Sequence, residues 1–139
     1  MSNVKPFHCR LYFFFCKDKE TTEIYTASIR EFEAAGRAIV PSAPVGHDGT
    51  EAWLQAAATA FGIAPDAFQR AIAPARARAQ QALAAHRPRL AGQRIFFFPD
   101  SQLELPLARF LSRELGMQLT EVGTPYLHRG HMAAELALL

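Results

Sequence analysis

Two short aromatic runs of strand length set the strongest limit on how this chain can fold. The first is Leu11-Tyr12-Phe13-Phe14-Phe15-Cys16, and the second is Gln-Arg-Ile-Phe-Phe-Phe at residues 93–98. Both are too short for a buried helix and rich in residues that favour strands. Each is followed by a helical pattern and a further apolar run, so the sequence predicts strand–helix–strand units at 11–40 and 93–122. Such a unit forms a parallel pair through a right-handed crossover.

The second unit has the clearer pattern. After its strand, Pro99-Asp100-Ser101 is a turn, and apolar residues from 103 to 115 follow at helical spacing. Gly116 suits the left-handed stop of that helix. A strand is expected at 117–122, then a turn at Gly123-Thr124-Pro125, and a final helix at about 132–139.

The remaining segments are interpreted in the same way. Residues 1–10 have no period and are expected to be a loose terminus, and a helix that ends at Gly36 precedes a strand at 38–40. Thr50 is expected to cap the first connecting helix, because its hydroxyl can accept a backbone N–H. Pro74 is expected to bend or restart the second.

These elements predict an α/β fold of two strand–helix–strand units joined by helices. We divide the chain into the loose terminus at 1–10, a partial domain at 11–48, connecting helices at 49–91 and a second partial domain at 92–139. Two parallel strands leave unpaired edges and bury little apolar surface. The last residues are also apolar, so we expect a piece of a larger protein.

Charge and composition exclude several functional classes. Half of the 139 residues are hydrophobic, a fifth are charged, and the net charge is +2, which gives no reason to expect nucleic acid or an anionic membrane as partner. No apolar run reaches the roughly 18 residues of a membrane span, and no signal peptide is recognisable, so a cytoplasmic location is expected. A cluster of arginines forms either a solvated helix face or a docking surface for phosphate or a partner: Arg70, Arg76, Arg78, Arg87, Arg89 and Arg94.

No catalytic or metal-binding constellation is recognisable. Cys9 and Cys16 are interpreted as reduced thiols, because their spacing fits no zinc pattern and an iron–sulfur cluster held by one chain needs more ligands. His128 and His131 have a spacing that suits a metal, but solvent exposure is the preferred interpretation. The pair His47-Asp48 lacks a nucleophile to activate. We therefore predict no catalytic residue and no metal site.

The candidate binding residues lie at one edge of the predicted sheet. Asp100-Ser101 follows one strand of the second unit, and Gly123-Thr124-Pro125-Tyr126 follows the neighbouring strand. Ligands of open parallel sheets lie at the carboxyl ends of the strands, so both loops are expected to face a ligand, with Tyr126 as a wall for a flat one. The alternatives are that Asp100 or Ser101 caps the helix and that Tyr126 packs under its loop. No glycine-rich nucleotide-binding motif is present.

The residues from Gly92 to Leu139 carry a family resemblance. The matching motifs are RIFFFPDSQLELPLARFL at 94–111, ELGM at 114–117 and VGTPYLH at 122–128. With Gly49-Thr50, Trp53-Leu54 and APARARA at 73–79, they resemble the N subunit of light-independent protochlorophyllide reductase, which is nitrogenase-like. By contrast, YTASIR at 25–30, FEAAGRAIV at 32–40 and SAPVG at 42–46 resemble the paralogous Y subunit of chlorophyllide a reductase.

The resemblance implies a partial Rossmann-like fold of a nitrogenase component 1-type subunit, from the end of its second domain to the first part of its third. In that family, an iron–sulfur reductase protein that uses ATP-Mg sends electrons through a 4Fe-4S cluster between two catalytic subunits. The electrons reach protochlorophyllide or a related tetrapyrrole. The family's cluster cysteines lie in a region that this sequence lacks, so no cofactor is assigned to this chain alone.

The resemblance also implies that the loop at 99–103 walls the substrate cavity beside 124–126. The implied pocket residues are Pro99, Asp100, Ser101, Gln102, Leu103, Thr124, Pro125 and Tyr126. The implied function is a fragment of the catalytic component in (bacterio)chlorophyll biosynthesis, without turnover alone. The alternatives are a non-catalytic tetrapyrrole-binding or subunit-docking module, a chlorophyllide a reductase fragment, and a non-functional mosaic.

Overall fold

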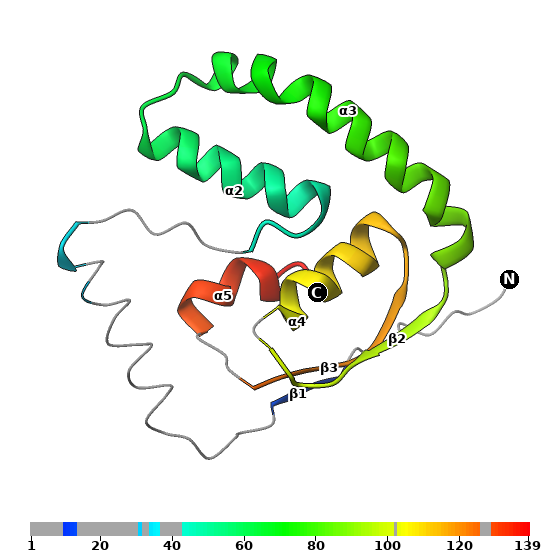
Figure 1. Ribbon diagram of the computed structural model, residues 1–139. Coiled ribbons are helices and arrows are strands. Elements are labelled where there is room, and N and C mark those ends of the chain that lie inside the picture. The colour runs from blue at the N-terminus through cyan, green and yellow to red at the C-terminus, as the bar shows by residue number, and fades with distance from the viewer. Residues whose placement is uncertain (1–9, 14–30, 32–33, 37–42, 102, 126–128) are drawn as a thin grey trace, which may run out of the picture.

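In the part of the chain that the structure describes, a three-stranded parallel sheet has helices on one side (Figure 1). The computed structural model describes residues 10–13, 31, 34–36, 43–101, 103–125 and 129–139. The strand order is β1-β3-β2, and both pairings are parallel. The elements are β1 (Arg10–Phe13), α2 (Gly46–Ala60), α3 (Pro65–Leu90), β2 (Arg94–Phe97), α4 (Glu104–Arg109), η1 (Phe110–Glu114), β3 (Gln118–Thr124) and α5 (Arg129–Leu136).

The helices form two layers above the sheet. Figure 1 shows α4 and α5 next to the sheet, α2 beyond them, and α3 running from the far end of α2 back to the start of β2. None of the helices in the described ranges combines the length and apolar character that a membrane span requires.

The core lies between the sheet and its covering helices. Leu105 and Ala108 of α4 pack with Leu119 and Val122 of β3, and all four are buried. Side chains of a strand alternate between the two faces of a sheet. Phe97 therefore packs against this core, while the aromatic residues on either side of it are exposed. The partly buried residues around the core are Ile95, Phe97, Met132, Leu136 and Leu139.

The predicted α/β class and the second strand–helix–strand unit are confirmed. β2 and β3 are parallel neighbours, connected by α4 and η1. β1 pairs with β3 in the same sheet, with Phe13 opposite Thr124. The predicted helix that ends at Gly36 and the strand at 38–40 lie mostly outside the described residues, so the division into two partial domains stays a prediction.

Three element boundaries differ from the sequence prediction. α2 begins at Gly46 rather than at Thr50, because a carboxylate from a distant helix satisfies its first N–H groups. α3 does not restart at Pro74, since strong helix formers on both sides outweigh one lost hydrogen bond. β3 includes Gly123 and Thr124, predicted as a turn, because β1 supplies them with a pairing partner.

The last turn of the α4 segment is a π-helix. Residues five apart lie about 140° from each other on an α-helix, so Arg109 and Glu114 would point away from one another. In η1 the wider turn brings the two onto one side, where the Arg109 NH1 and Glu114 Oε1 atoms are 3.3 Å apart. Gly116 follows with a positive φ of 76°, as the sequence predicts for the helix stop.

Candidate functional site

The loop that follows β2 is held by hydrogen bonds to Glu104. Ser101 and Glu104 have the spacing of a capping box, but only the glutamate half of that motif forms, because the Ser101 hydroxyl bonds the N–H of Leu103 and not that of Glu104. The Oε1 atom of Glu104 accepts the N–H of Asp100 at 2.9 Å and also that of Ser101. The Ser101 hydroxyl accepts the N–H of Leu103 at 3.1 Å. The N-cap of α4 is Leu103 and carries no side-chain cap hydrogen bond, so neither Asp100 nor Ser101 caps this helix as the alternative interpretation expected.

Glu104 is buried to an unusual degree for a carboxylate. The residue is only 3% exposed. Its second oxygen, Oε2, is buried without a hydrogen-bond partner among the described residues. An unsatisfied buried polar atom costs about 1–3 kcal/mol, so native proteins keep few of them. Glu104 was not among the predicted site residues, although the Ser-x-x-Glu spacing was a signal that could have identified it.

A glycine brings the two predicted loops together. A Cβ on Gly123 would lie 2.7 Å from Cδ of Pro99 and 3.3 Å from the carbonyl oxygen of Phe97. Only glycine therefore lets Pro99 rest directly on β3. The Pro99 loop consequently lies beside the carboxyl end of β3, as the order of the strands predicts.

The structure places the predicted pocket residues unequally. Asp100, Ser101 and Leu103 are exposed, while Thr124 is buried and Pro125 partly buried. Gln102 and Tyr126 lie outside the described residues. Their contribution to a pocket stays a prediction, and so does that of the exposed residues.

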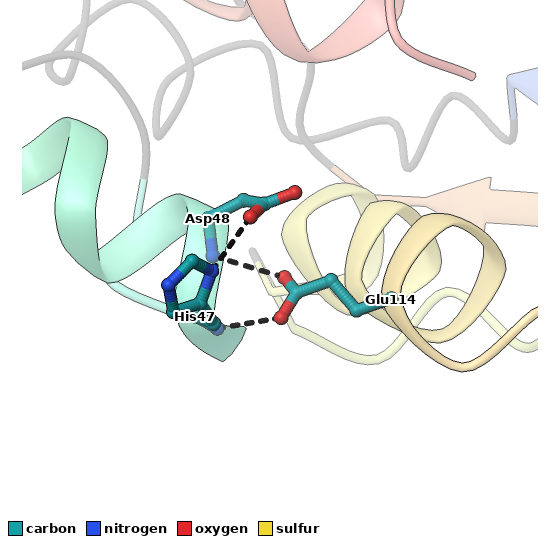
Figure 2. A group of neighbouring side chains, drawn as sticks. All are labelled: His47, Asp48 and Glu114. Carbon is teal, nitrogen blue, oxygen red and sulfur yellow. Dashed lines mark hydrogen bonds and ion pairs between the residues drawn. The ribbon is translucent and has the colours of Figure 1, made fainter. Parts of the chain in front are cut away.

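A second polar cluster joins α2 to the helices above the sheet (Figure 2). The Glu114 carboxylate accepts the backbone N–H of His47 at 2.7 Å and that of Asp48 at 3.2 Å, as Figure 2 shows. It thereby caps the N-terminus of α2, where free N–H groups and the helix dipole favour negative charge. His47 Nδ1 and Asp48 Oδ1 are 2.7 Å apart.

Arg109 lies at the centre of this junction. It is 2% exposed, and its Nε atom donates to Glu135 at 2.8 Å, NH1 to Glu114 at 3.3 Å and NH2 to the carbonyl oxygen of Val45 at 2.7 Å. A Cβ on Gly49 would overlap its guanidinium, so α2 can approach only because that residue is glycine. Three segments distant in sequence thus share one buried cation. No sequence pattern identified Arg109 or Glu114.

The cluster has the composition of a metal site but the bonding of a structural junction. His47, Asp48 and Glu114 each offer a ligand atom within 4.8 Å of the others. Both oxygens of Glu114, however, already accept backbone N–H groups, and the Arg109 cation contacts Oε1. A bound cation would share these oxygens with the N–H donors and would be repelled by Arg109.

A groove of about 390 Å³ lies between α2, α3 and η1. Its lining is mostly apolar, and includes Leu54, Ile72 and Phe110. Arg76 on its lining donates to both oxygens of Glu51. This hydrogen bonding raises the pKa of the Arg76 guanidinium above its ordinary value, while desolvation acts in the opposite direction. Arg76 is therefore paired within the protein. The other arginines of the predicted cluster are exposed: Arg70, Arg78, Arg87, Arg89 and Arg94.

Comparison with known proteins assigns the chain to a family. The family model described as Nitrogenase component 1 type Oxidoreductase matches residues 21–138. The chain belongs to this family. It is 60% identical over 111 residues to the light-independent protochlorophyllide reductase subunit N of Bradyrhizobium sp. strain BTAi1, which covers 79% of this chain and 26% of that relative. It is 69% identical over 96 residues to the subunit N of Rhodopseudomonas palustris strain BisB18. This match covers 69% of this chain and 22% of that relative.

The chain thus spans about a quarter of the length of the curated relatives it matches. The predicted resemblance to subunit N is confirmed by these relatives. The α/β architecture of the described residues is consistent with a fragment of a nitrogenase component 1-type protein.

Proposed function

We propose that this chain is part of the catalytic component of a light-independent protochlorophyllide reductase. The observation that carries the proposal is the identity of 60% over 111 residues to a subunit N, which extends over most of the chain. In the proposed complex, the chain acts with a partner catalytic subunit and an ATP-dependent iron–sulfur reductase protein. Residues 11–48 would end one Rossmann-like domain, 49–91 would connect, and 92–139 would begin the next.

The proposed role of this chain is to bind and orient the pigment. The loop at 99–103 and residues 124–126 would form part of the pocket wall, since both follow parallel strands at the same edge of the sheet. Gly123 supports this arrangement by allowing Pro99 to lie against β3. No proton donor or acceptor for the pigment is assigned to the described residues.

The iron–sulfur cluster would supply the electrons that reduce a ring double bond. The whole sequence holds two cysteines, Cys9 and Cys16, both outside the described residues, so this chain does not offer the complete thiolate set of a four-iron cluster. The cluster is therefore proposed for the assembled complex and not for this chain alone. What this chain adds is shape and orientation around the substrate.

A segment exchange tests the proposal. The matched residues of the Bradyrhizobium subunit N are replaced by those of this chain, and the chimaera is assembled with its partner subunit, the reductase protein and ATP. We expect the pigment to bind and protochlorophyllide to be reduced. A control chimaera carries the same segment with residues 94–124 scrambled, and it should do neither.

Two outcomes separate the proposal from its rivals. Assembly without pigment binding or turnover would overturn it. Specific pigment binding by the 139-residue chain alone, with no turnover in the chimaera, would instead favour a non-catalytic tetrapyrrole-binding module.

A further inference from the structure

The loop after β2 presents one exposed carboxylate on a rigid backbone. Asp100 is exposed, while its N–H is bound by the buried Glu104. The neighbouring Ser101 hydroxyl is committed to the N–H of Leu103. Among the described loop residues, Asp100 is therefore the acidic side chain that remains available to a ligand.

Three contacts determine where Asp100 lies. Glu104 Oε1 accepts the N–H groups of Asp100 and Ser101, so it fixes the backbone on both sides of the Asp100 carbonyl group. Pro99, immediately before, rests on Gly123. A loop backbone held in this way loses little conformational freedom when the side chain that it carries binds a ligand, which is how preorganisation increases affinity.

The unpaired oxygen of Glu104 indicates that this residue does more than cap a helix. A capping glutamate is ordinarily close to water, where its second oxygen is solvated, but Glu104 is 3% exposed and its Oε2 atom is buried without a partner among the described residues. Burial of Oε2 destabilises the fold, while Oε1 of the same carboxylate accepts the N–H groups of the loop. A buried polar atom of this kind calls for an explanation beyond local helix geometry.

We propose that Glu104 is a positioning residue that holds Asp100 for contact with the bound pigment. Asp100 would supply its carboxylate to an electron-poor centre of the tetrapyrrole, either the central metal ion or a hydrogen-bond donor at the ring edge. This inference rests on the proposed function, because it takes the pigment as the ligand. The positioning step itself concerns only backbone N–H groups of this chain.

Two substitutions of Glu104 separate positioning from packing. Glu104→Leu keeps the buried volume and removes both acceptors, whereas Glu104→Gln keeps one acceptor oxygen for the two N–H groups. Amide hydrogen exchange of Asp100 and Ser101 is measured in the assembled chimaera. We expect Glu104→Leu to speed exchange at these two amides by at least about tenfold, and Glu104→Gln to leave it within about threefold. Equal protection in both variants would overturn the inference.

Pigment affinity tests the ligand step in the same complex. We expect Asp100→Asn and Glu104→Leu each to weaken pigment binding by about tenfold. Because Glu104 acts through Asp100, the double variant should bind the pigment with the same affinity as Asp100→Asn. Glu51→Leu is the matched control on α2 and should leave affinity unchanged. Additive losses, or full affinity in Glu104→Leu, would overturn the inference.

The choice of pigment identifies the contact. The affinities of the parent and of Asp100→Asn are also compared for metal-free pigment. If the two affinities become equal, the Asp100 carboxylate contacts the central metal. If Asp100→Asn still binds more weakly, the carboxylate contacts a hydrogen-bond donor at the ring edge. If the parent chimaera assembles but binds no pigment, the proposed function fails and the Asp100 contact fails with it. If the parent binds and Asp100→Asn binds equally well, only the present inference fails.

Discussion

Replacing Arg109 with methionine should destabilise the chain more than any other single arginine substitution in the described residues. Methionine preserves much of the buried volume but removes three hydrogen bonds and the positive charge. The carboxylates of Glu114 and Glu135, whose side chains are only 5% and 4% exposed, would then lose this cation. Removing one partner of a buried ion pair costs about 3–5 kcal/mol, because the remaining charge stays buried.

The loss can be measured by urea unfolding of the 139-residue chain at low concentration. A denaturant slope of about 1.5 kcal/mol per M converts 3–5 kcal/mol into a fall of roughly 2–3 M in the transition midpoint. Trp53, the single tryptophan, lies on α2 and reports its release, while circular dichroism follows the helices as a whole. Since Arg109 connects α2 to the sheet layer, both signals should move together.

Arg76→Met is the matched control. It also removes an arginine from an ion pair, but the Arg76 and Glu51 side chains are 28% and 25% exposed, so water can solvate the remaining carboxylate. Its midpoint should stay close to that of the parent chain. Adding Glu135→Gln to Arg109→Met should recover part of the loss, because one buried charge disappears. A loss below about 1 kcal/mol for Arg109→Met would refute the reasoning.

Further predictions concern glycines and exposed aromatic residues. Gly46→Ala should lower the free energy of unfolding by about 2–4 kcal/mol, because the φ of Gly46 is 72° and a Cβ would overlap the Phe110 ring. Gly62→Ala should lower it by only about 1 kcal/mol, because Gly62 has a φ of 68° but open space around it. Thermal melting of the two variants compares backbone strain with and without overlap. Gly123→Ala should displace the Pro99 loop, and faster amide exchange at Asp100 would show it. Phe96 and Phe98 are 54% and 71% exposed, so their double substitution by serine should reduce self-association of the chain in sedimentation experiments, and unchanged association would contradict this.

Much of the helix and strand content follows from local pattern, and the exceptions have identifiable causes. Residues 94–122 could be predicted because strand, turn, helix and glycine stop each depend on neighbours in sequence. The start of α2 could not be predicted, because its cap is Glu114, 66 residues away from Asp48. The extent of β3 depended in the same way on pairing with β1.

The candidate site shows the same division. The Pro99–Leu103 loop was predicted from its place after a strand, whereas the alternative that Ser101 caps the helix is wrong, because the N-cap is Leu103. Glu104 was overlooked, because its spacing indicates a capping box but not that its second oxygen is buried and unpaired.

The sequence by itself determined the α/β class, the second strand–helix–strand unit and the family, because periodicity, turn residues and extended motifs are all written in consecutive positions. Only the tertiary structure decided that Arg109 and Glu114 share one side of a helix, that both bind the start of α2, and that Gly123 receives Pro99. These features depend on a π-turn and on contacts between segments far apart in the chain. Buried polar groups such as these are stabilised only when tertiary contacts pair them, and no local pattern specifies that pairing.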